Sequence, residues 1–234
     1  MALSLIVPTL NERESIGRLL RASCAVLDAT LPQRYEVVVV DDDSADETWR
    51  VAAALRGDLP ALRVVRRQHE RGLATAVVRG WQVARGEFLG TINADLQHPP
   101  DLLAEMQAAI VEADLVVATR FAGVCGADWP YHRRLASRLA RLLGRFLLPA
   151  AFTRVSDPLS GYYLFRRDVI AGIELHPLGY KTLIEILVRG RVHRIRECPY
   201  TMRRRALGRS KLGPRDTQRY VVQLLKLRAA LRQC

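Results

Sequence analysis

The chain has 234 residues, of which 49% are hydrophobic and 26% are charged. This composition is typical of a folded protein with one sizeable core, and it excludes a largely disordered chain. The formal net charge of +12, from 36 basic and 24 acidic residues, favours a polyanionic partner: nucleic acid, nucleotide phosphates or an anionic membrane.

Arginine supplies nearly all of the positive charge. Only Lys181, Lys211 and Lys226 are lysines, which leaves 33 arginines among the 36 basic residues. The planar guanidinium suits phosphate groups. Codon bias in a GC-rich genome explains the excess of arginine over lysine equally well, but it does not explain the net positive charge.

Cysteine and targeting patterns exclude further classes. The four cysteines are far apart and form no CxxC pair, so neither a zinc site nor a disulfide framework is predicted, and a reducing cytoplasm fits. The stretch MALSLIVPT lacks the basic region of a signal peptide, and no stretch approaches the ~18 apolar residues of a membrane span. We therefore expect a cytoplasmic protein that does not cross a bilayer by itself.

The first half alternates short apolar runs with stretches of helical spacing. Strands are predicted at residues 3–7, 36–40, 61–65, 87–92 and 114–119, and helices at residues 11–27, 46–55, 73–84 and 100–113. Strands without polar alternation, separated by helices, are typical of a parallel sheet covered on both faces. Residues 1–120 are therefore predicted to form a doubly wound α/β unit.

Pro8 and a set of polar residues lie where these strands end, and in such sheets ligands bind beyond the carboxyl ends of the strands. The residues there are Pro8, Thr9, Asn11 and Glu12, then Asp41, Asp42, Asp43 and Ser44, then Asn93, Asp95 and Gln97, and finally Thr119 and Arg120. One aspartate after a strand is more often a helix cap. Carboxylates at several strand ends instead favour a function, because they need a cation or hydrogen-bond donors. Neither GxGxxG after the first strand nor GxxxxGK[ST] occurs, which disfavours glycine-rich nucleotide loops.

The stretch INADLQHPP at residues 92–100 places a carboxylate, a carboxamide and an imidazole close together after a strand. Hard dications such as Mg²⁺ and Mn²⁺ prefer oxygen ligands. Asp95 and Gln97 are therefore candidate ligands, with a substrate diphosphate supplying the others. The alternative is a turn with a helix cap. A lone histidine before two prolines is more often structural, which is the favoured interpretation of His98.

The second half is more basic. A helix predicted at residues 133–148 carries leucines and Phe146 on one broad face, with a strip of arginines beside it. This pattern suits a helix in a membrane interface, although a core helix with a solvated arginine edge is slightly favoured from the sequence alone. A basic loop is predicted at residues 199–215, between a helix at residues 179–190 and an amphipathic basic helix at residues 216–231.

Seven segments together resemble a known family. In chain order they are VPTLNE (7–12), VVDDDSADET (39–48), RGLATAVVRGW (71–81), NADLQHPPDLL (93–103), SDPLSGYYLFRRDVI (156–170), GYKTLIEILVRG (179–190) and GRSK (208–211). They are similar to the dolichyl-phosphate (polyprenyl-phosphate) mannose synthase branch of the family-2, GT-A-fold glycosyltransferases. The first two occur across the wider family, whereas the later segments in this order are much more specific.

The resemblance implies a GT-A-type, doubly wound, mostly parallel α/β sheet flanked by helices, with amphipathic interface helices in the C-terminal half. Within one catalytic domain, residues 1–120 would bind the nucleotide sugar, and residues 121–234 would face the acceptor and the membrane. The donor-binding residues would be Pro8, Thr9, Asn11, Glu12, Asp41, Asp43, Gly72, Asn93 and Lys211. The metal ligands would be Asp95 and Gln97, and the catalytic residues Asp95, Arg120, Asp157 and Arg205. The acceptor phosphate would contact Arg120, Arg133, Ser137 and Ser160, with Gly161 near the sugar.

The implied reaction is the inverting transfer of a hexose, with mannose and GDP-mannose favoured, to a polyprenyl or dolichyl monophosphate, dependent on Mg²⁺ or Mn²⁺. The enzyme would be peripheral at the cytoplasmic face of the membrane, alone or through a membrane-anchoring partner protein. Relatives usually have aspartate where this chain has Asn93, and an aromatic residue where it has Met202. We expect Asn93 to weaken metal or donor binding without abolishing the site, because Asp95 remains.

Three alternatives stay open. The same fold would serve UDP-glucose or another donor, or a soluble hydroxyl acceptor. A nucleic-acid-binding protein is favoured by the net charge, but the 6% aromatic content and the acidic strand ends disfavour it. A non-catalytic relative acting as a partner subunit is suggested only by Asn93.

Overall fold

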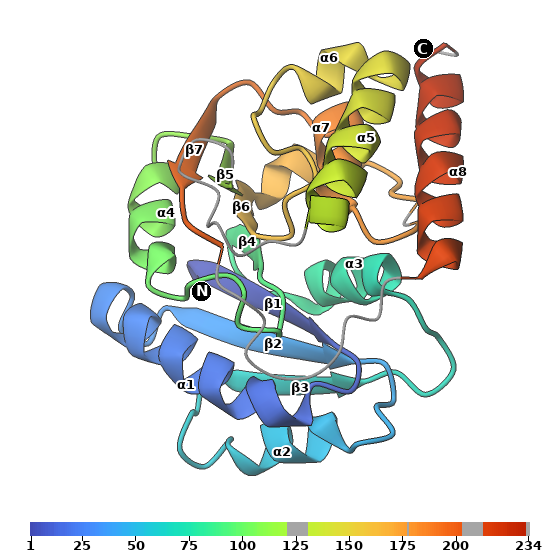
Figure 1. Ribbon diagram of the computed structural model, residues 1–234. Helices are drawn as coiled ribbons and strands as arrows, with labels where there is room; N and C mark the ends of the chain where they lie inside the picture. Colours follow the sequence, from blue (N-terminus) through green and yellow to red (C-terminus); the bar gives the residue numbers. More distant parts are fainter. Residues whose placement is uncertain (121–130, 177, 203–212, 233–234) are drawn as a thin grey trace.

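The computed structural model describes residues 1–120, 131–176, 178–202 and 213–232, with the side chains of residues 131–136 and 214 outside the description. These residues form a mostly parallel sheet flanked by helices, which confirms the predicted fold class (Figure 1). The described part of the sheet has seven strands in the order β3-β2-β1-β4-β6-β5-β7. Their bounds are β1 Leu3–Thr9, β2 Tyr35–Asp41, β3 Leu62–Arg66, β4 Phe88–Thr91, β5 Leu115–Thr119, β6 Tyr163–Arg166 and β7 Ile195–Pro199.

The middle of the sheet differs from a simple doubly wound order. The five strands predicted in the first half are present, but β5 does not lie beside β4. Between them lies β6, which comes from the second half of the chain and runs antiparallel to both neighbours. β7 extends the sheet beyond β5 in the parallel direction. The sequence analysis does not predict β6 or β7, and the two halves of the chain build one sheet.

The direction of β6 determines which segments lie at the edge formed by the carboxyl ends of the parallel strands. Thr91, at the carboxyl end of β4, pairs with Tyr163, the first residue of β6. The residues just before β6 therefore lie at the same edge as the carboxyl ends of the parallel strands. Thr119, at the end of β5, likewise pairs with Pro199, so the segment after β7 also starts at this edge.

Helices cover both faces of the sheet and enclose two apolar clusters. α1 (Arg13–Thr30), α2 (Thr48–Ala54) and α4 (Leu102–Ile110) cover one face. The other face is covered by α3 (Leu73–Val83), α6 (Pro149–Phe152), α7 (Thr182–Arg189) and α8 (Pro214–Leu231), and a 3₁₀ turn, η1 (Arg167–Ile170), follows β6. Neighbouring strand residues serve opposite faces, since Leu5 and Val7 belong to the first cluster and Ile6 to the second.

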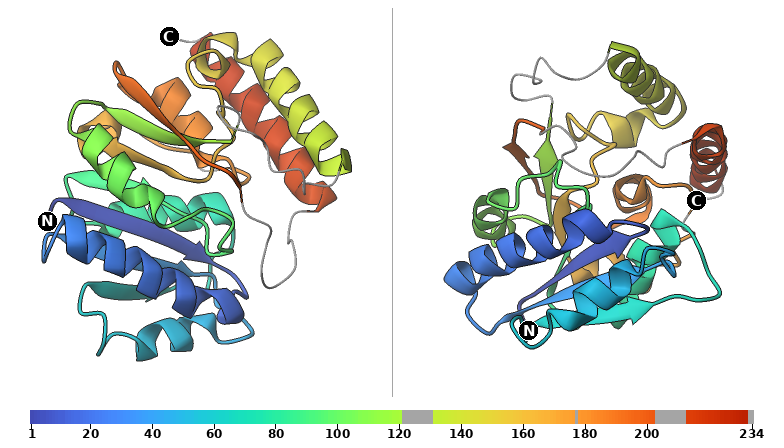
Figure 2. Two further views of the ribbon diagram at one scale, coloured as in Figure 1. Left: turned by 60° about the vertical axis from the view of Figure 1, so that its left-hand side comes forward. Right: turned by 60° about the horizontal axis from the view of Figure 1, so that its bottom comes forward.

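The predicted basic amphipathic helices are present as α5 (Tyr131–Leu147) and α8. They lie side by side (Figure 2). Tyr220 Oη of α8 donates a hydrogen bond to Ala140 O of α5 at 2.8 Å. The bounds of the predicted basic loop need correction, because Pro199 belongs to β7 and α8 already begins at Pro214. Among the helices that the structure describes, none has the length and apolar character needed to cross a membrane.

Candidate active site

The loop after β2 is built around Asp41. Its buried carboxylate accepts hydrogen bonds from Thr9 Oγ1 at 2.7 Å, Ser44 Oγ at 2.7 Å and Ser44 N at 2.8 Å. Because an ionised carboxylate has about four acceptor positions, most of its capacity is used within the protein. Asp41 therefore joins the ends of β1 and β2, and a nucleoside contact would use its remaining acceptor position.

The loop after β1 is fastened to the loop after β2 by backbone donors. Asn11 N donates to Ser44 Oγ at 2.8 Å, and Glu12 N donates to Thr48 Oγ1 at 2.9 Å. Asn11 lies at φ +51°, a left-handed conformation that asparagine adopts more readily than most residues. The predicted donor-binding residues that meet here are Pro8, Thr9, Asn11, Glu12 and Asp41.

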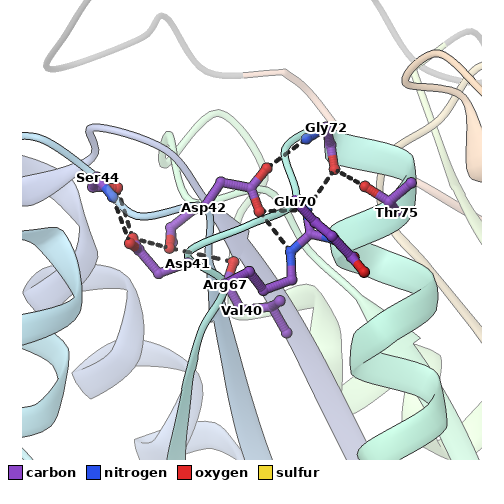
Figure 3. Close-up of polar contacts among 9 residues, drawn as sticks. Val40, Asp41, Asp42, Ser44, Arg67, Glu70, Gly72 and Thr75 are labelled. Atoms are coloured by element: carbon purple, nitrogen blue, oxygen red, sulfur yellow. Dashed lines mark hydrogen bonds and ion pairs between the residues drawn. The ribbon is translucent and has the colours of Figure 1, made fainter.

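Asp42 forms a separate cluster that the sequence analysis does not predict (Figure 3). Arg67 donates to Asp42 Oδ1 through Nε at 2.7 Å and through Nη2, and both side chains are 5% exposed. Gly72 N donates to Asp42 Oδ2 at 2.6 Å, and Gly72 lies at φ +139°, which favours glycine. The predicted donor-binding Gly72 is thus fixed at the start of α3. Arg67 gives no distinguishing signal in a chain with 33 arginines.

Asp43 completes the row of aspartates. Arg66 Nε donates to Asp43 Oδ1 at 2.6 Å, and the same guanidinium lies 4.2 Å from the centre of the Trp49 ring. Three consecutive carboxylates would repel one another without donors or cations. Each has its own partners, because Asp41 uses loop donors, Asp42 uses Arg67 and Asp43 uses Arg66. The negative charge at this edge is therefore largely compensated by these arginines and hydrogen-bond donors of the protein.

The turn after β4 holds the predicted metal ligands. Asp95 is 7% exposed, and its Oδ1 accepts a hydrogen bond from Gln97 N at 3.2 Å. Leu96, between them, lies at φ +58°, so the turn bends sharply. Asp95 and Gln97 therefore occupy a single tight turn at the carboxyl edge of the sheet.

His98 is structural, as the sequence interpretation favours. Its Nδ1 lies 2.7 Å from Tyr200 Oη, and its Nε2 lies 3.3 Å from Asn93 Nδ2. Burial lowers the pKa of His98 to about 4, so the imidazole is neutral at physiological pH. Both ring nitrogens have partners within the protein, so His98 connects Asn93, in the turn after β4, to Tyr200, which follows β7.

Asp95 and Gln97 fit a hard cation that completes its shell with substrate oxygens. Within the described residues, no three His, Cys, Asp or Glu side chains come together as a metal-binding group. Mg²⁺ is usually held by one or two carboxylates and by substrate phosphates rather than by an all-protein cage. A carboxylate and a carboxamide from one turn therefore suit a cation that arrives with a diphosphate.

The loop before β6 brings Asp157 to Arg120. Arg120 donates to Asp157 through Nε at 2.6 Å and through Nη2 at 2.9 Å, and Asp157 is fully buried. Ser160 Oγ donates to Ala118 O at 2.8 Å, which closes the loop against β5. Gly161 lies against Asn93, since a Cβ at position 161 would be 2.7 Å from Asn93 Nδ2. Five residues with predicted roles thus lie close together at the ends of β4 and β5.

Some predicted residues lie elsewhere. Arg205 and Lys211, together with the side chain of Arg133, lie outside the described residues, and their roles stay predictions. Ser137 is half-buried on α5. The sequence analysis assigns no role to Lys181, whose Nζ donates to Leu159 O at 2.6 Å in the loop before β6. Lys181 lies in the segment GYKTLIEILVRG, which contributes to the family resemblance, and this motif could have indicated the residue.

Comparisons with known proteins identify the family of this chain. Residues 4–173 match the family described as glycosyl transferase family 2. A dolichol-phosphate mannosyltransferase from Pyrococcus furiosus is 38% identical, over 97% of this chain and 64% of the relative. A dolichol-phosphate mannosyltransferase from Mycosarcoma maydis is 35% identical, over 96% of this chain and 78% of the relative. The chain therefore spans less than two thirds of the length of the Pyrococcus furiosus protein.

A solved structure supports the fold. Glucosyl-3-phosphoglycerate synthase from Mycobacterium tuberculosis, in complex with Mn²⁺, uridine diphosphate and phosphoglyceric acid, superposes with a TM-score of 0.71. The two proteins are 25% identical, and the match covers 97% of this chain and 78% of that chain. From the family match and the two relatives, this chain belongs to glycosyl transferase family 2.

Proposed function

We propose that this chain transfers a hexose, mannose first, from a nucleoside-diphosphate sugar to a polyprenyl or dolichyl monophosphate. GDP-mannose is the favoured donor. The observation that carries the proposal is that the Asp95 turn and the Arg120–Asp157 pair lie at the same edge of the sheet, where Gly161 of the loop before β6 packs against Asn93. Family membership and relatives named dolichol-phosphate mannosyltransferase support the choice of sugar and acceptor.

Asp95 and Gln97 would hold a divalent cation, Mg²⁺ or Mn²⁺, against the diphosphate of the donor. When bound, such a cation neutralises charge on the departing nucleoside diphosphate. The chain contributes a single tight turn that carries both residues, and the neutral His98 next to it is held by Asn93 and Tyr200. The loops around Asp41 and Asp42 hold the ends of β1 and β2 and the start of α3 in place beside it.

The acceptor chemistry needs no general base. A phosphomonoester has a second pKa of about 6, so its oxygen is already largely ionised at neutral pH. The protein must instead draw the anion in and strip it of water, which requires cations. The +12 net charge and Arg120 suit that task. A single displacement at the anomeric carbon would invert its configuration.

A lipid acceptor requires contact with a membrane, and α5 provides a suitable surface. Leu139, Leu142 and Phe146 are 56%, 61% and 76% exposed, which is unusual for three large apolar side chains on one helix. Arg138 and Arg145 are exposed on the same helix. An apolar face beside a basic strip favours binding at an anionic membrane interface. We therefore propose peripheral association with the membrane through α5, at the cytoplasmic face.

Product formation tests the proposed reaction. The purified chain is incubated with radiolabelled GDP-mannose, a polyprenyl phosphate in detergent and Mn²⁺, and the organic phase is separated by thin-layer chromatography. We expect a labelled lipid that is absent when a chelator is added or the acceptor is omitted. Failure to form a metal-dependent lipid product with GDP-mannose or any other nucleotide sugar of a panel would overturn the proposal.

Liposome flotation tests the membrane surface separately. The variant Leu142→Ser/Phe146→Ser should float less with anionic vesicles than the parent chain, while Val111→Ser, at an exposed apolar residue after α4, should float as the parent does. Equal flotation of all three proteins would contradict a role for α5.

A further inference from the structure

Lys181 lies at the carboxyl edge of the sheet, immediately before α7. Its Nζ donates to Leu159 O at 2.6 Å, within the loop that carries Asp157. Its own carbonyl accepts from Gln223 Nε2 of α8 at 3.2 Å. The next residue, Thr182, lies 2.5 Å through its hydroxyl from Tyr163 Oη of β6. Lys181 is therefore fixed from α8, from the sheet and from the loop beside the active site.

The charge of Lys181 is not balanced in the way that the charge of Arg120 is. Arg120 forms a two-bond ion pair with the buried carboxylate of Asp157. Among the described ion pairs none includes Lys181, and Leu159 O is the described acceptor for its ammonium group, which has three protons. The ring of Tyr180, 4.9 Å away, adds a weaker contact. The ammonium group thus has donors left for an incoming anion.

Holding this cation in place is costly. Burial lowers the pKa of Lys181 to about 8, the charge of Arg120 acts in the same direction, and Asp157 opposes them. Among the described residues, the titratable groups Tyr180 and His98 also lie near it, and His98 is neutral. A part-buried charge with no carboxylate partner among the described residues is unusual unless it meets an anion in the working protein.

Lysine is also rare in this chain. Only three of the 36 basic residues are lysines, so a lysine at this place stands out against a background of arginine. The two side chains are not interchangeable, because the ammonium is a compact point charge whereas the guanidinium is a wide planar fork. A confined position that must meet one anionic oxygen suits the ammonium group.

We propose that Lys181 is a further anion-binding residue of this site and that its ammonium group donates to a phosphate oxygen of a bound substrate. The proposal rests on the proposed function for the identity of the substrates. The phosphate belongs either to the donor's diphosphate or to the acceptor's monophosphate. A purely structural role, as a tie to Leu159 O, is the competing interpretation.

Binding measurements decide between these interpretations without relying on sugar transfer. Isothermal titration calorimetry with GDP and Mn²⁺ measures binding of a diphosphate like that of the donor. Calorimetry with farnesyl phosphate measures binding of a monophosphate like that of the acceptor. Lys181→Met removes the charge at similar length, and Lys226→Met makes the same change at an exposed lysine of α8. We expect Lys181→Met to lower the affinity for one probe by about tenfold to a hundredfold, as for a lost hydrogen bond to a charged group. Lys226→Met should bind both probes as the parent chain does.

The probe that weakens identifies the source of the phosphate. Weaker GDP binding assigns Lys181 to the donor, and weaker farnesyl phosphate binding assigns it to the acceptor. Unchanged binding of both probes, or a parent chain that binds neither, would overturn the proposal. Because product formation is not measured, a chain that binds phosphates through Lys181 but makes no mannolipid would contradict the proposed function alone.

A second variant separates charge from packing. Lys181→Cys is alkylated either with 2-bromoethylamine, which restores an ammonium group, or with 1-bromopropane, which gives a side chain of the same length without charge. The alkylated parent chain controls for modification of the native cysteines. We expect the ammonium form alone to recover phosphate binding, with both forms melting at similar temperatures. Equal binding by the two forms would overturn the proposal in favour of a structural role.

Discussion

Arg120 and Asp157, 37 residues apart in the sequence, form a two-bond ion pair of 2.6 and 2.9 Å at the carboxyl edge of the sheet. The pair joins the end of β5 to the loop before β6, and it depends on the antiparallel insertion of β6. Asp157 is fully buried and the Arg120 side chain is 12% exposed, so neither charge is well solvated without the other.

Removing the charge of Asp157 should therefore affect stability and activity together. Asp157→Asn removes the carboxylate that faces a poorly solvated guanidinium, and breaking such a pair typically costs about 3–5 kcal/mol. Asp58→Asn breaks the exposed pair with Arg21 and should cost less than about 1 kcal/mol. Urea unfolding gives both values. Equal costs for the two variants would contradict the structural importance of the Arg120–Asp157 pair.

Asp95 is the residue on which metal-dependent turnover should depend. Asp95→Ala removes the carboxylate of the proposed cation site and should abolish turnover, whereas Glu112→Ala, at a side chain that is 79% exposed, should leave it intact. Mn²⁺ binding in the presence of GDP, followed by electron paramagnetic resonance, should fail in the first variant only. Full turnover by Asp95→Ala would exclude it as a ligand.

Asn93 provides a complementary test, in which a carboxylate is added to the site and not removed. Asn93→Asp adds a carboxylate two residues before Asp95, and the neutral His98 can donate to it through Nε2–H after a change of tautomer. We expect activity equal to or higher than that of the parent chain, with tighter Mn²⁺ binding. A marked loss of activity would show that a neutral amide is required at this position.

Gly161 should tolerate no side chain. A Cβ there would lie 2.7 Å from Asn93 Nδ2, so Gly161→Ala must displace the Asn93 amide. A shift of about 1 Å in a positioning group can cost about a hundredfold in rate, and we expect a loss of tenfold or more in kcat/KM. The matched control is Gly57→Ala, because a Cβ at Gly57 meets no atom within 4 Å. Similar kinetics for both variants would contradict the close fit.

His98 should make the fold sensitive to acid. Its pKa falls from an ordinary value of 6.5 to about 4 on folding, because the imidazole is buried. Between these values the unfolded chain binds a proton that the folded chain does not, so stability is complete above pH 6.5 and is lost as the pH falls towards 4. The full effect is on the order of 3 kcal/mol.

Urea unfolding across this pH window measures the effect. His98→Gln should reduce the pH dependence of the unfolding free energy, whereas His193→Gln, at an exposed histidine, should preserve it. An unchanged pH dependence in His98→Gln would show that other groups cause the acid sensitivity.

The strands of the first half could be predicted because each is a continuous apolar run. β6 could not, because YLFR lies in a segment whose neighbours read as a loop, and its place depends on pairing with β4 and β5. β7 escaped prediction because Arg196 and Glu197 are exposed at the edge of the sheet and interrupt its apolar pattern.

The candidate site likewise has features that the sequence predicts and features that it does not. Strand order places Asp41 and Asp95 at one edge, and that much follows from the sequence pattern. The pairing of Asp42 with Arg67 does not, because nothing in the sequence distinguishes one arginine from 32 others. The role of Asp157 depends on β6, and its pairing with Arg120 spans a distance that local patterns do not encode.

Diffraction from a crystal soaked with GDP-mannose and Mn²⁺, recorded at the manganese absorption edge, tests the central claim most directly. We predict one anomalous peak within coordination distance of the Asp95 carboxylate and the Gln97 side chain, bridged to the diphosphate. A peak remote from Asp95, or a bound diphosphate without manganese beside this turn, would contradict the account.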